Sequence, residues 1–256
     1  MRIIVTGGLG HLGSRVVTAL GDLGHDAIVA SRRTGVDVKT GAGLTRVLTG
    51  ADAVVHTADT MRPWEFGSVT TGGTRRVGEA AATLARPPHV VYISIVGVDR
   101  VPYPYYRAKW AVERELETLG IPATVMRATQ FHSLAASIAR ARVGPVGLGV
   151  KGFRIQPVDI AFVARRLAEV ASEPAPAGFA RHVDLTGPDL LTAEQIAGLV
   201  AGHQGRPIRR RLDLPALGGT LKAFASGAIL PGADVEVGGE RFTAWLARQP
   251  PRLPRR

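Results

Sequence analysis

The sequence predicts an α/β fold in which a doubly wound, parallel Rossmann-type sheet carries a small C-terminal lobe, and three observations support it. In the first half of the chain, short apolar runs alternate with helical patterns, which is typical of parallel strands joined by crossover helices. The first of these runs leads directly into a glycine-rich turn and a helix. After residue 130 the alternation loosens into Gly- and Ala-rich segments, which predict a lobe over the carboxyl edge of the sheet.

The strands of the first half are short and almost entirely apolar, as buried parallel strands require. We expect them at residues 2–7, 27–31, 52–58, 89–94 and 122–128, with a further short strand at 35–38. The intervening helices are expected at residues 11–23, 43–50, 68–85 and 105–120. Right-handed crossovers would then place helices on both faces of one sheet.

The second half is expected to complete the sheet and to form the lobe. Helices are expected at residues 133–141, 160–171 and 191–205, the last capped by Thr192, and strands at 153–159 and 182–188. Residues 214–247 should be helical at each end. We therefore divide one structural unit into a Rossmann core (1–150), the remaining sheet edge with a small substrate-covering lobe (151–250), and a disordered basic tail (251–256).

The charge of the chain limits the partners to consider. The 256 residues carry a formal net charge of +11, but Arg and Ala are so abundant that a coding bias explains the charge better than a polyanion partner does. The densest basic run, residues 209–211, is predicted to be a solvated strand, and three further arginines lie in the tail. We therefore expect a small-molecule substrate and no nucleic-acid partner.

The absence of cysteine excludes disulfides, thiolate catalysis and cysteine-ligated metal sites, and it fits a cytoplasmic protein. We expect no metal site. The opening residues, MRIIVTGG, are typical of a buried strand rather than a signal peptide, and no apolar run of about 18 residues predicts a membrane span. The sequence allows a homodimer through a helical face without predicting one.

The turn at residues 6–13, TGGLGHLG, predicts a phosphate-binding loop. Two registers fit it, Gly8-x-Gly10-x-x-Gly13 and Gly7-x-x-Gly10-x-x-Gly13. In both, glycine allows a tight turn and a close backbone approach to a pyrophosphate, whose charge faces the amides at the helix N-terminus. A position between the first strand and the first helix is the context in which this pattern predicts a bound dinucleotide.

The end of the second strand predicts which dinucleotide binds. A carboxylate there would hold the ribose 2′-hydroxyl of NAD, but the chain has Ser31, Arg32 and Arg33. Arginine binds the 2′-phosphate of NADP through charge-assisted hydrogen bonds, so we expect NADP(H) as the cofactor. Asp37 is placed to meet the adenine amine. A second interpretation of nearly equal weight is that Asp37 is an ordinary turn residue with no cofactor contact.

Taken in order, these motifs resemble the short-chain dehydrogenase/reductase superfamily, and more closely its atypical NmrA-like branch of NAD(P)-binding proteins. The resemblance spans roughly residues 1–190 and rests on TGGLGHLG, SRR, HTAD, YISIVGVD, YYRAK and RATQFH. It implies that Ser94 hydrogen-bonds the substrate carbonyl and that Tyr105 donates a proton to its oxygen as hydride arrives. Lys109 would bind the nicotinamide ribose and lower the pKa of the phenol.

Three features leave alternatives open. Thr70 stands where related enzymes often carry an asparagine that helps to relay protons. The NmrA-like branch includes members that bind NADP(H) as sensors with little or no turnover. Tyr106, three residues before Lys109, could replace Tyr105 as the phenol in the pocket, because both spacings put a phenol beside the ammonium on one helical face.

The resemblance and the strand ends together supply the other expected site residues. Those expected at the cofactor are Gly7, Gly10, His11, Leu12, Gly13, Ser31, Arg32, Arg33, Asp37, Val38, Thr57, Ala58, Lys109 and Thr129. Those expected at the substrate are Asp59, Trp64, Tyr106, Gln130, Phe131 and His132. His132 is either a second acid or a structural histidine. Because Phe153 and Phe224 are also expected nearby, the pocket should take a planar apolar carbonyl compound rather than a nucleotide sugar.

The sequence therefore predicts an NADPH-dependent reductase that transfers hydride to a small apolar or aromatic ketone, enone or quinone. The alternative is a non-catalytic NADP(H)-sensing regulatory module that binds a protein partner.

Overall fold

A parallel sheet forms the centre of the structure, which is a computed structural model that describes residues 1–138, 142–143, 146–205, 208 and 210–251. Its strands are β1 (Arg2–Thr6), β2 (Asp26–Ala30), β3 (Ala53–His56), β4 (His89–Ile95), β5 (Ala123–Ala128), β9 (Phe179–Arg181), β10 (Asp184–Thr186) and β13 (Val235–Val237). The order is β13-β10-β5-β4-β3-β1-β2, with β9 beside β5, and every pairing is parallel. The predicted fold class is confirmed.

The strand order reverses at β1, which lies between β2 and β3. The chain moves outward from β1 in one direction to β2 and in the other through β3, β4 and β5, so the connections at the carboxyl end of β1 diverge. This is the topological switch point at which open α/β sheets bind their ligands. The predicted phosphate loop begins there, directly after β1.

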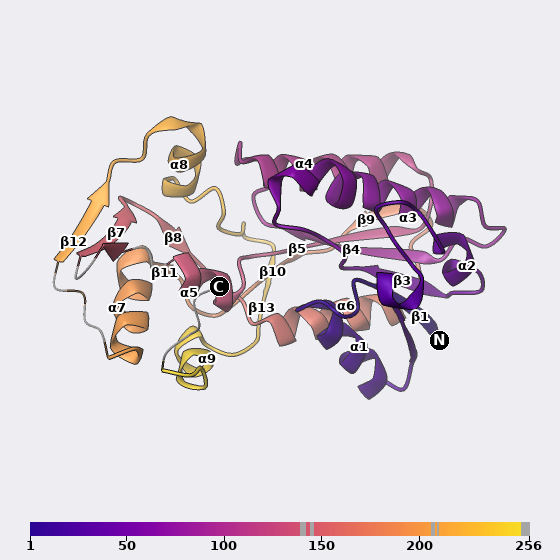
Figure 1. The fold of residues 1–256 in the computed structure, drawn as a ribbon, viewed down its shortest axis with the longest axis horizontal. Coiled ribbons are helices and arrows are strands. Elements are labelled where there is room, and N and C mark those ends of the chain that lie inside the picture. The colour runs from indigo at the N-terminus through magenta and orange to yellow at the C-terminus, as the bar shows by residue number, and fades with distance from the viewer. Residues whose placement is uncertain (139–141, 144–145, 206–207, 209, 252–256) are drawn as a thin grey trace.

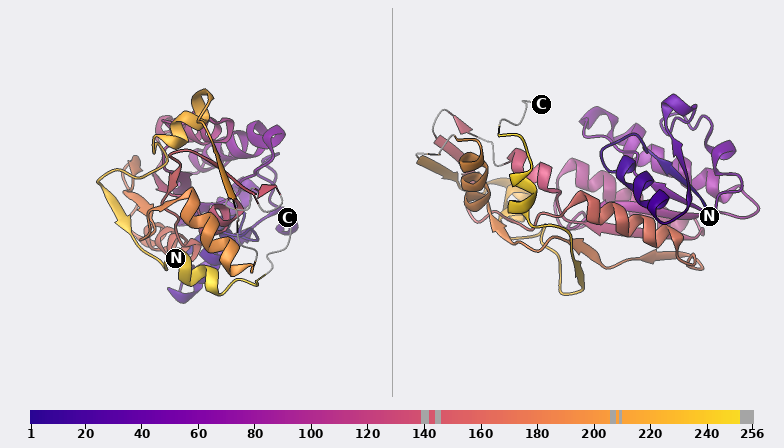
Figure 2. Two further views of the ribbon diagram at one scale, coloured as in Figure 1. Left: turned by 90° about the vertical axis from the view of Figure 1, so that its left-hand side faces the viewer. Right: turned by 90° about the horizontal axis from the view of Figure 1, so that it is seen from below.

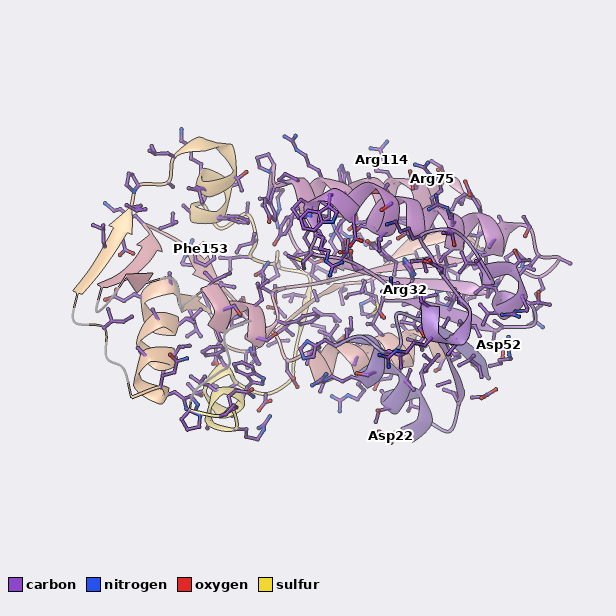
Figure 3. The ribbon with its side chains drawn as sticks, viewed as in Figure 1. Asp22, Arg32, Asp52, Arg75, Arg114 and Phe153 are labelled. Carbon is purple, nitrogen blue, oxygen red and sulfur yellow. The ribbon has the colours of Figure 1, made fainter. Side chains whose placement is uncertain are left out.

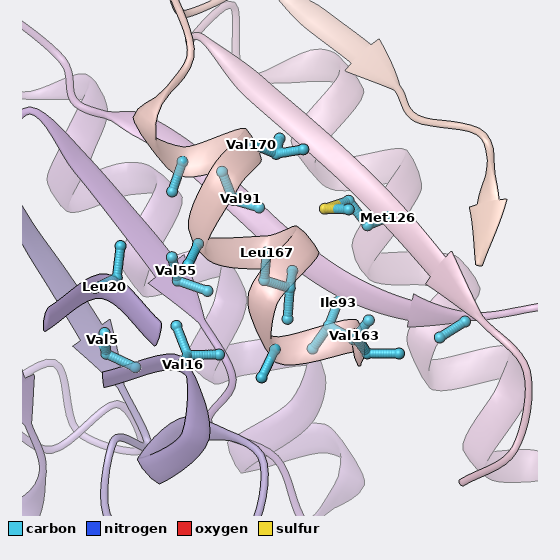
Figure 4. Close-up of a cluster of buried hydrophobic side chains, with 14 of the residues drawn as sticks. Val5, Val16, Leu20, Val55, Val91, Ile93, Met126, Val163, Leu167 and Val170 are labelled. Carbon is cyan, nitrogen blue, oxygen red and sulfur yellow. The ribbon is translucent and has the colours of Figure 1, made fainter. Parts of the chain in front are cut away.

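Helices cover both faces of the sheet (Figure 1). Helices α1 (Gly13–Asp22) and α6 (Ile160–Ser172) pack on one face, and α2 (Leu44–Leu48), α3 (Gly72–Ala82) and α4 (Pro104–Thr118) pack on the other. Figure 4 shows the first of these interfaces, where Leu167 and Val163 of α6 lie against Val55, Val91 and Ile93 of the strands. Because both faces are covered, the strands are apolar throughout rather than alternating.

The C-terminal lobe lies beyond the carboxyl ends of the strands (Figures 1 and 2). It contains α5 (His132–Ile138), α7 (Ala193–His203), α8 (Gly218–Ala225), α9 (Phe242–Ala247) and the short strands β6 (Arg142–Val143), β7 (Val146–Val150), β8 (Arg154–Ile155), β11 (Leu191–Thr192) and β12 (Arg210–Leu214). Thr192 caps α7 as predicted, and its side chain accepts a hydrogen bond from the backbone amide of Gln195. A third apolar cluster joins the lobe to α4.

Three local predictions differ from the structure. Residues 35–38 form no strand, because Gly35 adopts a left-handed φ of 77° after the short helix η1 (Arg32–Thr34) and turns the chain away. The strand expected at 153–159 is only β8, which pairs antiparallel with β11 in the lobe. The helix expected at 68–85 begins as a π-helix, η3 (Phe66–Thr71), behind the short helix η2 (Pro63–Glu65).

The predictions for residues 139–141, 209 and 252–256 concern parts of the chain outside the described residues. Among the helices that are described, none is both long enough and apolar enough to cross a membrane.

Candidate active site

The phosphate loop has the geometry that a close backbone approach requires. Gly7 has a φ of 71°, and a Cβ placed there would lie 2.8 Å from the backbone of Ala58. At Gly13 a Cβ would lie 2.3 Å from the carbonyl oxygen of Gly7 and 2.7 Å from Thr57 Oγ1. Side chains at either position would therefore push apart β1, α1 and the end of β3. Since Gly7 is the residue with positive φ, the structure favours the register Gly7-x-x-Gly10-x-x-Gly13.

The loop leads into α1 without a capping side chain, because the N-cap residue is Leu12. The N-terminus of α1 therefore has no side chain that competes with a ligand for its backbone amides. Its first turn also contains no acidic residue that would repel a phosphate. These features fit the pyrophosphate of a dinucleotide.

The end of β2 also fits a dinucleotide ribose. Ser31 Oγ is buried and has no hydrogen-bond partner among the described residues, although its backbone N–H donates to Thr34 Oγ1. Arg32, which is labelled in Figure 3, and Arg33 are both exposed. Neither forms an ion pair within the described residues. Beside the phosphate loop, this segment therefore offers a ligand the hydroxyl of Ser31 and the guanidinium groups of Arg32 and Arg33, none of which is paired among the described residues.

The residues expected at the adenine and at the inner cofactor wall are held by the protein itself. Asp37 Oδ1 accepts the backbone N–H of Lys39 at 2.8 Å, so its carboxylate stabilises its own turn. Val38 packs over the position of Gly73 at the start of α3. Thr129 is buried, and its hydroxyl lies 3.2 Å from that of Thr186, inside the sheet.

Tyr105, Lys109 and Asp59 meet at one carboxylate oxygen. Tyr105 Oη donates to Asp59 Oδ2 at 2.6 Å, and Lys109 Nζ donates to the same oxygen at 3.0 Å and to the carbonyl of Ile93 at 2.7 Å. Thr70 Oγ1 donates to Asp59 Oδ1 at 2.6 Å. Asp59 follows Ala58, whose backbone packs on Gly7, so this cluster stands directly beside the phosphate loop.

The charges of this cluster are strongly coupled. Burial opposes ionisation of Asp59, but the ammonium of Lys109 and the hydrogen bonds outweigh it and hold the pKa of the carboxyl below its ordinary value. Burial would lower the pKa of Lys109, whose side chain is 4% exposed, yet Asp59 outweighs it and raises that pKa. Lys109 Nζ also lies 4.5 Å from the ring centroid of Tyr92.

The pKa of Tyr105 is raised, not lowered as the sequence suggested. Burial disfavours the phenolate, and the carboxylate of Asp59 disfavours it further. The ammonium of Lys109 acts in the opposite direction but does not compensate. The sequence prediction considered the tyrosine and lysine as an isolated pair, whereas in the structure an anion lies between them.

Ser94 bonds a different carboxylate from the one that holds Tyr105 and Lys109. It is 2% exposed, and its Oγ donates to Glu113 Oε1 on α4. Glu113 also pairs with Arg127 of β5, whose Nη1 bonds Asp99 at 3.0 Å. The only hydroxyl proton of Ser94 is therefore committed to a buried ionic network, and in this arrangement it does not reach a substrate carbonyl.

The two neighbouring tyrosines have different surroundings. Tyr106 is buried in the third apolar cluster, its hydroxyl accepts a hydrogen bond from Gln130 Nε2 at 3.1 Å, and burial raises its pKa to about 12. The structure thus places Tyr105, and not Tyr106, with Lys109. Gln130 Oε1 is buried with no partner among the described residues, so one acceptor remains available beside Tyr106.

The other residues expected at the substrate are dispersed. Trp64 is 78% exposed on the loop after β3. Phe131 packs against the apolar core between the sheet and helices α1 and α6. His132 is buried against Phe242 and Trp245 of α9, and its Nε2 lies 3.0 Å from the carbonyl oxygen of Glu240. The interpretation of His132 as a structural histidine fits this position.

Sequence reasoning missed the roles of Asp59 and Glu113. Asp59 was expected only at the substrate. No sequence pattern predicts the loop conformation that brings its carboxylate to Lys109. Glu113 had one: it follows Lys109 by four residues on the same face of α4, so a second buried charge was foreseeable.

Comparisons with known proteins agree with this geometry. Residues 3–133, about half of the chain, match the model of a family described as the NAD dependent epimerase/dehydratase family. No curated protein sequence matches the chain.

Several solved structures share the fold at low sequence identity. A nucleoside-diphosphate-sugar epimerase from Staphylococcus aureus has a TM-score of 0.75 and 17% identity, covering 97% of this chain and 100% of its own. The NADPH-dependent quinone oxidoreductase of Escherichia coli, complexed with NADPH, has a TM-score of 0.71 and 18% identity, covering 97% and 95%. A short-chain dehydrogenase/reductase superfamily protein from Agrobacterium tumefaciens with bound NAD has a TM-score of 0.68 and 18% identity, covering 96% of each chain. At these identities the likeness shows the fold alone.

Proposed function

The chain belongs to the NAD dependent epimerase/dehydratase family, and from this premise we propose that it is an NADPH-dependent reductase of small apolar or aromatic ketones, enones or quinones. The observation that carries the proposal is the convergence of Tyr105 and Lys109 on Asp59, directly beside the loop of Gly7. Among the described residues, a half-buried phenol and a buried ammonium thus lie together beside the loop where the family binds its dinucleotide.

In this mechanism the protein binds and orients the substrate and protonates its carbonyl oxygen. When bound, the nicotinamide would supply a hydride to the carbonyl carbon. Tyr105 would turn its hydroxyl from Asp59 to the carbonyl oxygen and give up its proton there, which completes the alcohol. With a quinone, the reduced carbon would then lose a proton to water and the second oxygen would gain one, which gives the hydroquinone. Lys109 stabilises the phenolate that remains, because its ammonium is held in the interior by Ile93 and Asp59.

We propose that the residues after β2 make the protein prefer NADPH to NADH. Arg32 and Arg33 are exposed cations on the strand end that faces the cofactor ribose, and Ser31 Oγ lacks a partner there. A 2′-phosphate would accept from all three side chains. The quinone oxidoreductase from Escherichia coli, which shares the fold, is itself NADPH-dependent.

The apolar character of the substrate is proposed from the residues beyond the tyrosines. Tyr103, Tyr106 and Phe224 form an aromatic cluster on the lobe side of Tyr105. A nucleotide sugar would instead need charged and hydrogen-bonding partners for its diphosphate. We also propose that the protein belongs to the NmrA-like branch, because of the motifs named in the sequence analysis, and that it is cytoplasmic, because cysteine is absent from the chain.

One specific observation favours the alternative function, a non-catalytic NADP(H) sensor. Both hydroxyls expected at the substrate carbonyl are bonded to carboxylates, Tyr105 to Asp59 and Ser94 to Glu113. A site that binds the cofactor but keeps these bonds would sense NADP(H) without turnover.

Oxidation of NADPH by the purified protein, measured against a panel of quinones, enones and aromatic ketones with NADH in parallel, tests the proposal. Tyr105→Phe should abolish ketone reduction while retaining NADPH binding, and Tyr106→Phe is the matched control because its hydroxyl contacts Gln130 rather than Lys109. Tight NADPH binding without turnover of any panel member would contradict the reductase and support the sensor. Loss of activity only in Tyr106→Phe would move the proton donor by one residue.

A further inference from the structure

The C-terminal lobe contains a cavity of about 380 Å³ whose lining side chains are all apolar. Its walls come from α5, β7, β8, α7, β12 and α8, and every lining residue is Gly, Ala, Val, Ile, Leu or Phe. The larger of these side chains include Phe153, Ile155, Ile196, Leu214, Leu221 and Phe224. Phe153 lies within the lobe, away from the Rossmann core (Figure 3).

The cavity is deep on one side and open on the other. Ile155 and Ile196 are 1% and 2% exposed and form its floor. Leu214 and Leu221 are 49% and 38% exposed and form part of its rim. An apolar hollow with exposed leucines at its mouth is unfavourable in water, and such surfaces mark places where an apolar group binds.

An aromatic wall connects the cavity to the tyrosine cluster. Phe224 lines the cavity and also contacts the ring of Tyr106 at 6.1 Å and the ring of Tyr103 at 6.3 Å between centroids. Tyr106 in turn contacts Tyr105 at 6.5 Å. These ring contacts form one aromatic connection between the cavity and Tyr105.

We infer that this cavity is a binding site for the uncharged apolar portion, an alkyl chain or an aryl ring, of the molecule whose carbonyl lies at Tyr105. The lining offers no polar side chain, so a phosphate, sugar or charged group placed there would lose its hydrogen bonds to water without replacement. The position of the carbonyl rests on the proposed function, but binding of the apolar portion does not. The rival occupant is a second copy of the chain seated on the leucine rim.

A homologous series of straight-chain 1-alkanols, from hexanol to decanol, tests the site without any need for turnover. Isothermal titration into the full-length protein should show the dissociation constant falling by about two- to fourfold for each added methylene until the cavity is filled. The same dependence on chain length should appear in KM for a series of alkyl-substituted quinones, if the reductase function is correct.

Two rim substitutions and a matched control locate the site. Leu214→Gln and Leu221→Gln should each weaken decanol binding by about tenfold, because a polar group then borders the chain. Leu217→Gln should leave it unchanged, since Leu217 is 69% exposed, lies between the other two in sequence and does not line the cavity. All three positions are exposed, and unchanged melting temperatures would confirm that the variants fold.

The outcomes separate the two proposals. Binding that depends on chain length without any NADPH oxidation supports the cavity and overturns the reductase. Turnover of quinones with no dependence on chain length, together with equal affinity for all alkanols, overturns the cavity and leaves the reductase standing. A dimer in sedimentation that Leu214→Gln dissociates, with no alkanol binding, overturns the cavity in favour of the second copy.

Discussion

Asp59→Asn should lower the pH at which Tyr105 ionises. The substitution keeps the size of the side chain and a carbonyl oxygen for the hydrogen bonds, but it removes the negative charge that lies against the phenol. Tyr105 Oη stands 2.6 Å from Asp59 Oδ2, and the pKa of the phenol is raised by burial and by this carboxylate. Without the carboxylate, the remaining charge beside the phenolate is the ammonium of Lys109, which favours it.

The size of the effect follows from the geometry. Two full charges 2.6 Å apart interact by about 6 kcal/mol at an effective dielectric constant of about 20. Asp59 is 22% exposed, so water screens part of this interaction. A neighbouring charge typically moves an ionisation midpoint by about 1 to 3 pH units, and we expect a decrease in that range. The alkaline limit of reductase activity should move down with it, because the phenol must be protonated to act as an acid.

The assay is an alkaline titration of the ultraviolet absorbance of tyrosinate in the intact protein. The chain has four tyrosines, so subtracting the curve of Tyr105→Phe isolates Tyr105. Thr70→Val is the matched control: it removes a hydrogen bond to Asp59 Oδ1 but leaves the charge, so it should move the midpoint much less. It also remains informative if Asp59→Asn folds poorly with its buried lysine unpaired. An unchanged or higher midpoint in folded Asp59→Asn would refute the electrostatic account.

Three further predictions concern the cofactor and the core. Gly13→Ala should weaken NADPH binding at least about tenfold in a fluorescence titration, because its Cβ would lie 2.3 Å from a loop carbonyl oxygen. Gly21→Ala on the same helix is the matched control, because its Cβ would meet nothing within 4 Å. In urea unfolding it should raise the free energy of unfolding by about 0.5–1 kcal/mol. Replacing Arg32 and Arg33 by Ser should raise the Kd for NADPH by about tenfold or more and leave NADH nearly unaffected in parallel titrations. His56 is buried, and burial together with Lys109 lowers its pKa from 6.5 to about 4. Since its folded pKa is below the unfolded one, its contribution to stability is complete above pH 6.5 and is lost as the pH falls towards 4, by up to about 3 kcal/mol. Urea unfolding of His56→Gln over the same window should show a loss smaller by this amount, because His89, whose pKa is also lowered to about 4, still contributes.

The parts of the protein that sequence predicted well are those set by local patterns. The phosphate loop needs glycine at positions where a Cβ would strike backbone, so Gly7 and Gly13 could be identified without any tertiary information. The strands could be identified because both faces are buried and the runs are apolar throughout. Residues 35–38 were also expected to be a strand but form none, because Gly35 adopts a left-handed φ and turns the chain first.

The orientation of Ser94 shows where local patterns stop being sufficient. Its position at the end of β4 was predictable, but its face of the sheet follows from its neighbours across the sheet. Ser94 lies opposite Arg127 in the register of β4 and β5, and both side chains meet Glu113 of α4. Only the paired strands and the helix together show that this serine belongs to an ionic network.

That network also explains why Tyr105 rather than Tyr106 faces the lysine. Tyr105, Lys109 and Glu113 recur every four residues and form one face of α4. Tyr105 bonds Asp59, Lys109 bonds Asp59 and the carbonyl of Ile93 in β4, and Glu113 bonds Arg127. Rotating α4 about its axis to bring Tyr106 to Asp59 would break all of these bonds and leave a buried ammonium and a buried carboxylate unpaired, which costs several kcal/mol. Buried ion pairs add little net stability, but they select one rotation of the helix over others. The tyrosine at the four-residue spacing is therefore fixed towards the phosphate loop, and its neighbour, about 100° further round the helix, is fixed towards the lobe.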